Sequence, residues 1–245
     1  MKKFFIILIV LIAAFGCKDS EEKTKLKYCE NQLKLISAPI NLKEISFNFN
    51  QTGKECIKEV ETKLGVDICD SMTLFGIPFD IETVKLNKTK NSIALLVRTY
   101  KECEVFPQCL LHNYFEILYN SNHQLLIEGE FSSKKDIKNL IPKFYAENND
   151  SFDIKPNRSS LFIQWDNKVN KDSLSSIFQY IIEGYFSAVN QYSLKKYNLD
   201  ICSLSHSQID SLQLEFPFNL ELFRYANRTV PPVPPPFKEI ESLLK

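Results

Sequence analysis

Residues 158–197 have the sequence RSSLFIQWDNKVNKDSLSSIFQYIIEGYFSAVNQYSLKKY, and this stretch decides the fold class. Its first part, Arg158–Asp166, is short and largely apolar, as is typical of a strand. Asp172 then predicts the start of a long helix, because apolar residues follow it at spacings of three and four. These apolar residues are Leu174, Ile177, Phe178, Ile181, Ile182, Tyr185, Val189 and Tyr192. A strand followed by a helix with an apolar stripe predicts a helix packed on a sheet.

The segments on either side extend this pattern. Upstream, the sequence predicts a strand over 92–99, a hairpin with strands at 113–119 and 124–128, and a helix from Ser132 or Ser133 to about 148. Pro142 lies inside that helix and should kink it or shift its start. Downstream, we predict a strand over 199–204 and a helix ending near Leu214, which the capping box of Ser205 and Gln208 begins. The whole order predicts an α+β fold: a two-layer sandwich of a mixed β-sheet with helices on one face.

Residues 28–90 are predicted to form a small N-terminal α+β element. Ile45, Phe47 and Phe49 alternate with polar residues, which favours a strand, and Gly65 should end a helix over 54–64. A second strand is expected near 81–86. The predicted organisation is a signal peptide (1–16), a lipidated tether (17–27), this element (28–90), the main α+β domain (91–227) and a proline-rich tail (228–245).

The composition excludes several classes of protein. The 245 residues include 30 basic and 30 acidic side chains, so the chain lacks the basic excess that a nucleic-acid partner requires. Only six glycines are present, which leaves little material for loops that bind phosphate groups. The 44% hydrophobic content is that of a globular protein rather than a disordered one.

The N-terminus has the layout of a secretory signal peptide. Lys2 and Lys3 precede an apolar run that ends at Phe15, and the run is too short to span a bilayer. The Ala14-Phe15-Gly16-Cys17 sequence resembles a bacterial lipobox, so we expect cleavage before Cys17 and diacylation of its thiol. The alternative is an ordinary signal peptide in which Cys17 is incidental. A lipid on Cys17 would anchor the chain in the cell envelope, with the outer membrane as the expected location.

Six further cysteines are even in number, as expected for disulfides in an oxidising compartment. The nearest predicted pair is Cys103–Cys109, and Cys56 could be joined to Cys69 across the end of the predicted helix. A metal site formed by Cys103, Cys109 and His112 is the less favoured alternative, because the second ligand pair of a structural zinc site is absent. No metal or cofactor is therefore predicted.

Residues 113–218 resemble the periplasmic domain of the ExbD/TolR family of biopolymer-transport accessory proteins, in its longer variety with a C-terminal extension. The pieces that carry the resemblance occur in order: Leu125–Gly129, Phe162–Asp166 with Lys168 and Val169, Gly184-Tyr185, Asn190-Gln191, Lys195–Tyr197, Leu204 with Gln208, and Phe216-Pro217. Members of that family have a membrane helix with an aspartate that takes part in proton flow, and this chain has no counterpart. The resemblance thus implies contact with the cell wall or an envelope partner, without the proton-driven role.

Candidate catalytic residues are few, and each has a simpler interpretation. The sequence contains no P-loop, G-x-S-x-G, H-E-x-x-H or calcium-loop pattern. Ser205-His206-Ser207 is better explained as a helix cap than as part of a catalytic triad, and Asp166 as a turn residue. Tyr180, Tyr185 and Tyr192 share a helix face and are expected in the core rather than on a sugar-binding surface. The prolines at 231–236 predict a stiff exposed segment, or a ligand for an aromatic groove.

The function predicted from these features is a non-enzymatic interaction or scaffolding module on a lipid anchor. Its expected partner is an envelope protein or peptidoglycan, with no nucleic acid and no cofactor. A ligand-capture lipoprotein that feeds a transporter is the alternative from another class. A hydrolase that uses His206 or His112 is the third hypothesis.

Overall fold

The computed structural model describes residues 25, 26, 28–46, 48–68, 73–81, 83, 84, 91–99, 113–150, 156–166, 169 and 171–223. The expected signal peptide, Cys17, most of the tether and the proline-rich tail lie outside the described residues. So do Cys103, Cys109 and His112. Within the described part of the chain, no helix is both long enough and apolar enough to cross a bilayer.

The main sheet has seven strands in the spatial order β2-β4-β9-β8-β5-β6-β7. Its four middle strands, β4, β9, β8 and β5, pair in parallel, and the strands outside them pair antiparallel. The strands are β2 (Thr73–Ile81), β4 (Asn91–Thr99), β5 (Asn113–Tyr119), β6 (Leu125–Ile127), β7 (Glu130–Ser132), β8 (Ser159–Trp165) and β9 (Leu220–Leu222). The predicted α+β fold with a mixed sheet is confirmed.

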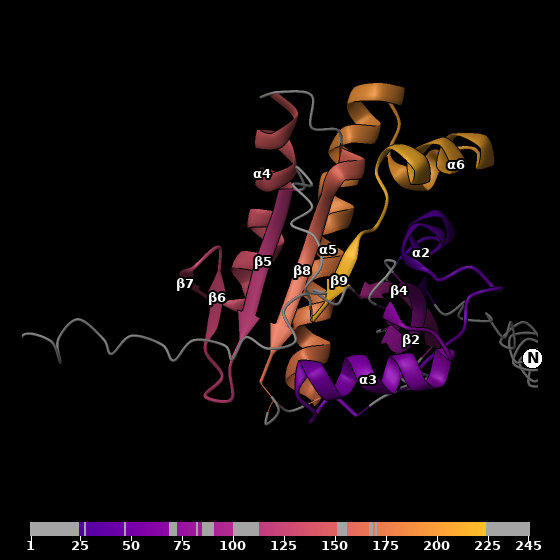
Figure 1. Cartoon of the computed structure of the whole chain (residues 1–245). Coiled ribbons are helices and arrows are strands. Elements are labelled where there is room, and N and C mark those ends of the chain that lie inside the picture. The colour runs from indigo at the N-terminus through magenta and orange to yellow at the C-terminus, as the bar shows by residue number, and fades with distance from the viewer. Residues whose placement is uncertain are drawn as a thin grey trace, which may run out of the picture.

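Two long helices, α4 (Lys134–Asp150) and α5 (Lys171–Tyr197), lie next to each other against the sheet (Figure 1). Their close approach depends on Gly184 of α5. A Cβ atom added there would lie 3.0 Å from the Cβ of Ile141 on α4. The small residue therefore lets the two helix backbones come together, and Pro142 is accommodated inside α4.

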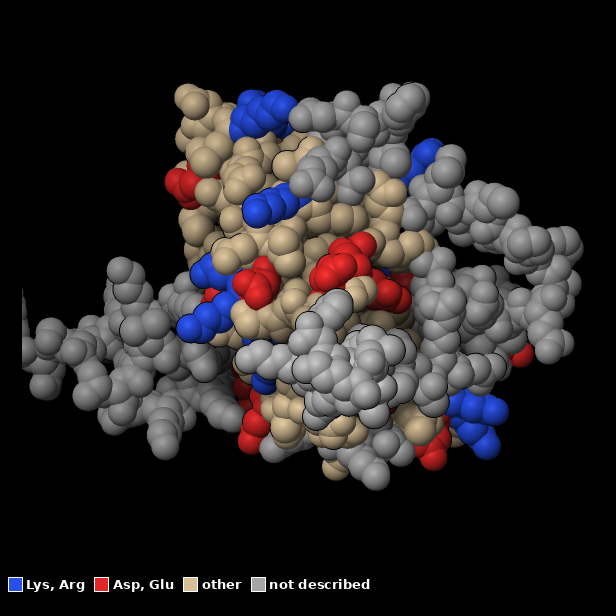
Figure 2. Space-filling model, turned by 90° about the vertical axis from the view of Figure 1, so that its left-hand side faces the viewer, with Lys and Arg blue, Asp and Glu red and all other residues tan. Residues whose placement is uncertain are grey.

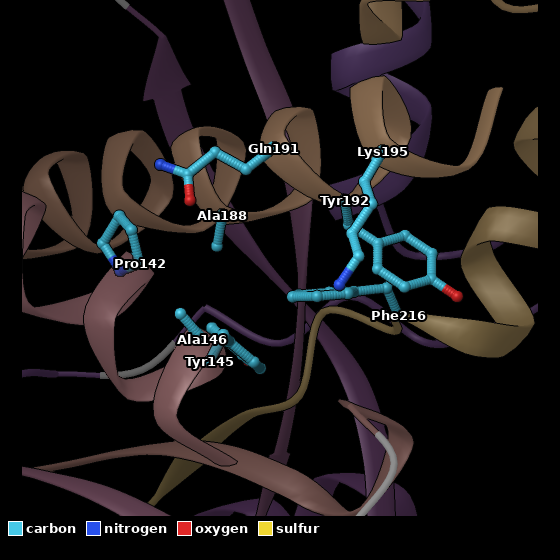
Figure 3. Close-up of a pocket in the computed structure, with 8 residues that line it drawn as sticks. All are labelled: Pro142, Tyr145, Ala146, Ala188, Gln191, Tyr192, Lys195 and Phe216. Atoms are coloured by element: carbon cyan, nitrogen blue, oxygen red, sulfur yellow. The ribbon is translucent and has the colours of Figure 1, made fainter. Parts of the chain in front are cut away.

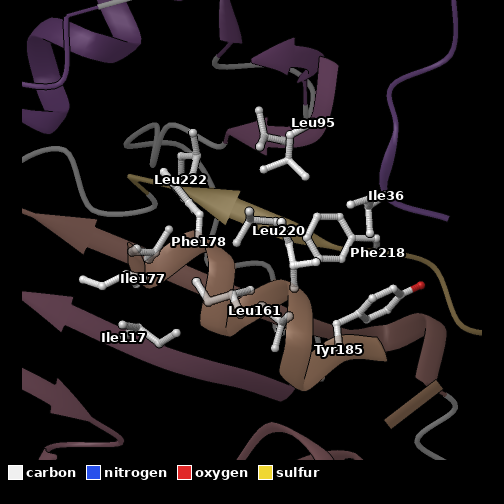
Figure 4. Close-up of a cluster of buried hydrophobic side chains, with 14 of the residues drawn as sticks. Ile36, Leu95, Ile117, Leu161, Ile177, Phe178, Tyr185, Phe218, Leu220 and Leu222 are labelled. Carbon is white, nitrogen blue, oxygen red and sulfur yellow. The ribbon is translucent and has the colours of Figure 1, made fainter. Parts of the chain in front are cut away.

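The core lies between these helices and the sheet (Figure 4). Trp165, at the end of β8, is 2% exposed, and its indole N–H donates to the carbonyl of Phe49 at 2.9 Å. Phe178 of α5 meets the Trp165 ring edge-on at 6.2 Å and contacts Phe79 of β2 in the same way. Aromatic packing of this kind joins α5 to both halves of the sheet.

The N-terminal region belongs to the same sheet and the same core. Helix α2 (Glu30–Ile36), helix α3 (Gly53–Leu64) and strand β2 supply residues such as Ile36, Cys56 and Phe75 to one hydrophobic cluster with the rest of the domain. Because β2 pairs with β4 along nine residues, the boundary expected at residue 90 falls between two paired strands. A separate two-stranded sheet joins β1 (Lys25–Leu26) to β3 (Thr83–Val84), so the end of the expected tether is in a strand.

A disulfide connects Cys29, just before α2, with Cys202 in the short 3-10 helix η3 (Ile201–Ser203). Next to it, the Asn31 side chain donates to the carbonyls of Ile201 and Leu204, both at 2.9 Å. The bond therefore fixes α2 to the segment that leads into α6 (His206–Glu215).

The Cys56–Cys69 link that the sequence allowed is wrong, because Cys56 is a free thiol buried in the core. Burial raises the pKa of Cys56 to about 12, and the charges of Glu59 and Glu55 add to that shift. The predicted Cys103–Cys109 pair lies outside the described residues and stays a prediction.

Several predicted elements are confirmed, and others are wrong. The helix over 54–64 with its stop at Gly65, the strand over 92–99 and the hairpin are all present. The predicted strand over 199–204 is wrong: this segment is η3, capped by the Asp200 carboxylate, which accepts from the Ser203 N–H at 3.1 Å. The strand expected over 45–49 is not found among its described residues: Glu44, just before it, makes an isolated bridge to Gly76, and Phe49 already lies in a turn. That short bridge covers part of the outer edge of β2 and limits its pairing with other chains.

A candidate binding groove

The described residues form a surface groove of about 360 Å³ (Figure 3). We call it the α4–α5 groove, because these two helices form its walls. Its lining residues are Pro142, Tyr145, Ala146, Ala188, Gln191, Tyr192, Lys195 and Phe216.

The helical repeat explains why these side chains converge. Ala188, Gln191, Tyr192 and Lys195 lie at spacings of three and four on α5, which places them along one face of that helix. The opposite wall is the middle of α4, and Phe216 enters from the residue that ends α6. Small side chains at Ala188 and Ala146 leave the hollow open between the two helices.

Three aromatic residues line the groove, but Tyr145 and Phe216 are only 2% and 1% exposed and belong to the core, so Tyr192 alone is partly exposed. Phe216 lies between the other two: its ring centroid is 4.5 Å from that of Tyr145 and 5.5 Å from that of Tyr192. The Phe216 backbone is fixed by a hydrogen bond to α5, because the buried Tyr185 hydroxyl donates to the Phe216 carbonyl at 2.8 Å. Burial raises the pKa of Tyr145, so its hydroxyl stays neutral. The floor of the groove is therefore closely packed and uncharged.

The Tyr192 ring is held in place by a polar network outside the groove. The Glu215 carboxylate accepts from the Tyr192 hydroxyl at 2.8 Å and from the Ser211 hydroxyl at 3.0 Å, and it forms an ion pair with Lys196. Hydrogen bonding from Lys196, ahead of the two hydroxyls, lowers the pKa of Glu215 although burial opposes the shift. The Tyr192 hydroxyl is therefore already hydrogen-bonded to Glu215.

The groove offers a ligand the Gln191 amide, which can donate and accept hydrogen bonds, and the Lys195 ammonium, which only donates. Gln191 and Lys195 are exposed residues of α5, and Figure 3 shows the Lys195 side chain extending from the helix toward Phe216. Lys195 has no acidic partner among the described residues, in contrast with its neighbour Lys196. No carboxylate lines the groove. An occupant should therefore present apolar rings or side chains together with carbonyl or carboxylate oxygens.

A second polar cluster lies on the sheet and is closed to ligands. Arg98, Ser160 and Glu221 come from β4, β8 and β9, and the Arg98 guanidinium donates to the Ser160 hydroxyl while its Nε lies 3.9 Å from Glu221. Arg98 is 8% exposed and Glu221 is 2% exposed. Burial lowers the pKa of Arg98, and the Glu221 charge opposes that shift. This cluster stabilises three adjacent parallel strands rather than forming an open site.

Charge on the side of β6, β7 and α4 is mixed. Figure 2 faces this side and shows acidic side chains near its centre with lysines and arginines around them. Glu116 and Glu128 meet here, since the Glu116 backbone N–H donates to the Glu128 carboxylate. Burial, opposed by that hydrogen bond and assisted by the Glu116 charge, raises the pKa of Glu128. Neither sign of charge dominates the described surface on this side.

The other residues singled out in the sequence have structural roles. His206 is the exposed first residue of α6, and Gln208 accepts from the Ser205 N–H at 2.9 Å, as the capping box predicts. Asp166 accepts from the Ser121 N–H at 3.1 Å, which is the contact of a turn residue. Among the described residues, no group of three or more His, Cys, Asp and Glu side chains could hold a metal ion.

The three tyrosines of α5 do not share one surface. Tyr185 is completely buried, whereas Tyr180 and Tyr192 are partly buried against the core. The core expectation is therefore confirmed for Tyr185, and Tyr192 also lines the groove. Sequence reasoning missed the groove as a whole, because its floor residue Phe216 comes from the end of a different helix.

No protein-family model, no curated protein and no solved structure matches this chain.

Proposed function

We propose that this chain is a cell-envelope lipoprotein, anchored through a lipid on Cys17, whose α+β domain is a non-enzymatic interaction or scaffolding module. The α4–α5 groove carries the proposal. It offers the partly exposed Tyr192 ring, the Gln191 amide and the Lys195 ammonium group, a combination of apolar and polar groups that suits the binding of a ligand. Its partner would be an envelope protein or peptidoglycan, and the outer membrane is the proposed location.

The disulfide supports the export part of this proposal. Disulfides persist in oxidising compartments such as the periplasm and the cell surface, and they are rare in the cytosol. Cys29 and Cys202 are 173 residues apart in the chain and yet are bonded inside one domain. A chain that is exported with its signal peptide would meet the conditions that this bond requires.

The arrangement of the domain also supports a role in interaction. Residues 113–218 form the hairpin, α4, β8, α5 and α6 in the order that motivated the resemblance to the ExbD/TolR periplasmic domain. We propose that this region is related to that domain in architecture and in its contact with envelope partners. The proton-driven role of the family is left out, since its membrane helix and aspartate have no counterpart in this sequence.

A ligand-capture lipoprotein is the second candidate, and the size of the groove favours it. A volume of about 360 Å³ lies at the low end of the range of small-molecule sites, about 300–1,000 Å³. The two candidates differ in what binds. A capture protein would hold a small apolar ligand in the groove and release it on denaturation, where mass spectrometry of the extract would detect it.

The proposed function can be tested by site-specific photo-cross-linking in cells. A photoreactive amino acid at Lys195, on the groove, should form one defined adduct with an envelope protein or with peptidoglycan. The same amino acid at Lys58, exposed on α3, is the control position. The adduct should disappear when Ala146→Arg, at an exposed helical position, fills the groove from α4. Equal adducts from both positions, or an adduct that survives Ala146→Arg, would overturn the proposal.

The anchor is tested separately. The full-length chain should incorporate an alkyne-labelled fatty acid and lose this label with Cys17→Ser. A chain whose label is unaffected by Cys17→Ser, or one that is never labelled, would refute the lipid anchor without bearing on the groove.

A further inference from the structure

Strand β7 is an open edge of the main sheet. It is the last strand in the spatial order, and Figure 1 shows it at the side of the sheet opposite β2. The edge at β2 is partly covered, because Lys43 and Ile45 make backbone hydrogen bonds with Gly76. Among the described residues, no segment pairs with the outer side of β7. An edge strand of this kind is a template for pairing with another chain.

The hydrogen bonds of the neighbouring strands show which backbone groups of β7 point to this open edge. The Glu128 N–H donates to the Glu116 carbonyl at 3.1 Å, and hydrogen-bonded pairs alternate with non-hydrogen-bonded pairs along antiparallel strands. Leu126, two residues before Glu128, therefore directs its N–H and carbonyl to β5. Phe131 lies opposite Leu126 on β7, so its own N–H and carbonyl point away from β6, toward the open edge.

The Phe131 side chain is exposed and continues an apolar row across the sheet. Phe131 pairs with Leu126, which in turn pairs with Leu118 of β5. Paired residues have their side chains on one face of the sheet, and here it is the face opposite the core, because the neighbouring Ile127 belongs to the core. Leu126 is 7% exposed, whereas Phe131 is 52% exposed. A ring from a second strand at this edge would cover Phe131 and complete the row.

The charges around Phe131 suit pairing with the same segment of a second copy. Residues 128–135 have the sequence EGEFSSKK, with two acidic residues before the phenylalanine and two basic residues after it. When two copies pair antiparallel about Phe131, the acidic half of each segment lies beside the basic half of the other. Glu130 is the kind of charge that protects an edge from pairing, yet in this register it lies opposite Ser132 of the second copy rather than another glutamate. Parallel pairing would instead place like charges side by side.

We propose that β7 pairs with β7 of a second copy of this chain, antiparallel and centred on Phe131, and so joins two sheets into one. The two Phe131 residues form a hydrogen-bonded pair, in which the N–H of each donates to the carbonyl of the other. Their rings lie next to each other on one face of the joined sheet. Strands this short give a small interface, so the dimer is weak, with a dissociation constant on the order of 100 μM. This pairing needs neither the α4–α5 groove nor the lipid anchor, so it goes beyond the proposed function.

Paired cysteines test this register in cells that produce the full chain. Glu130 lies opposite Ser132 of the second copy in a non-hydrogen-bonded pair, whose Cα atoms are about 4.5 Å apart, within the range of a disulfide. Glu130→Cys chains mixed with Ser132→Cys chains, one of them with a size tag, should form a mixed disulfide dimer when copper phenanthroline is added. The yield should be about tenfold higher than for either variant alone, because a residue and its own copy are diagonal neighbours about 7–8 Å apart.

Further variants separate strand pairing from chance collision and from misfolding. Lys58→Cys, exposed on α3, measures collision and should give no more dimer than either edge variant alone. Phe131→Pro, added to both edge variants, should abolish the mixed dimer, because it removes the N–H that faces the second copy and no hydrogen bond inside the sheet. If Phe131→Pro does not fold, Phe131→Lys, which places two like charges opposite each other, should have the same effect. Resistance to proteolysis shows which variants are folded, and Phe131→Tyr, which keeps the ring, should leave the dimer unchanged.

Three outcomes would overturn the inference. They are absence of the mixed dimer, equal yields from the mixed pair and from Lys58→Cys, and a mixed dimer that survives both Phe131→Pro and Phe131→Lys. Adducts of Glu130→Cys with a different protein, in place of the dimer, would assign the edge to that protein and would overturn self-pairing. Photo-cross-linking at Lys195 reports on the groove alone, so the failure of one proposal is distinguishable from the failure of the other.

Discussion

Removal of the Cys29–Cys202 disulfide, by replacing both cysteines with alanine, should lower the free energy of unfolding by about 5 kcal/mol. The magnitude follows from the length of the loop. The two cysteines are 173 residues apart, so the bond restricts most of the unfolded chain, and the chain-entropy relation gives about 5 kcal/mol for a loop of this size. A shorter loop such as Cys103–Cys109 would contribute far less.

The folded state should survive the double substitution. The contacts beside the bond do not need it: Asn31 donates to two carbonyls of the η3 segment, and the Gln213 side chain donates to the Lys34 carbonyl at 2.9 Å. Most of the loss therefore arises in the unfolded state, which becomes more expanded. The dependence of the free energy on urea concentration should accordingly become steeper.

Urea unfolding measures the loss of unfolding free energy. Trp165 is the signal, because it is the single tryptophan of the chain and is buried. For a slope of about 2.5 kcal/mol per molar urea, the midpoint should fall by about 2 M. Asp210→Ala, which removes the 2.7 Å surface ion pair with Lys34 at the same contact, is the matched control and should cost less than about 1 kcal/mol. Equal midpoints for the natural chain and the double alanine variant would refute the reasoning.

Three further predictions address the core and the groove. Cys56 should react with iodoacetamide at pH 8 at least a hundredfold more slowly in the folded protein than in urea, because burial raises its pKa to about 12; comparable rates by mass spectrometry would contradict this. Gly184→Ala should destabilise the protein by about 1–2 kcal/mol through its clash with Ile141, and Ile141→Val should recover part of this loss in urea unfolding. Glu215→Gln should cost less than about 1 kcal/mol at pH 7, because Lys196 lowers the pKa of Glu215 and the ionised form is the stabilising one above about pH 4.3. This cost should disappear as the pH falls to about 3, and an equal cost at both pH values would show that the charge is irrelevant.

The elements predicted correctly are those whose evidence lies within a few neighbouring residues. The apolar stripe of α5 extends over several turns, and Gly65 adopts the left-handed conformation (φ 72°) that its position after α3 requires. Strand β9 (Leu220–Leu222) gave no comparable evidence, since three residues are too few to show a period. It is a strand because it lies between β4 and β8, whose residues come from distant parts of the chain. Such a strand is specified by its neighbours rather than by its own sequence.

The pairing of the cysteines also depends on contacts between distant parts of the chain, so it could not be predicted from the sequence. Six cysteines allow 15 pairings, and closeness in sequence favoured local pairs such as Cys56–Cys69. The structure instead joins Cys29 to Cys202, because α2 packs beside η3 through Asn31. The wrong strand over 199–204 has the same origin. Its apolar residues are buried in a 3-10 turn, where Asp200 caps the backbone and the disulfide fixes the position.

The groove and the proposed anchor are linked through one segment of the structure. Cys29 lies two residues after the expected tether and is bonded to η3, and η3 leads directly into α6. Helix α6 in turn supplies Glu215, which holds Tyr192, and ends at Phe216, the floor of the groove. Helix α2 reinforces this connection, since Lys34 forms an ion pair with Asp210 of α6. Tension on the lipid anchor would therefore reach the groove through a covalent bond and one helix, so a partner held there would be tied to the membrane even if other parts of the domain open locally.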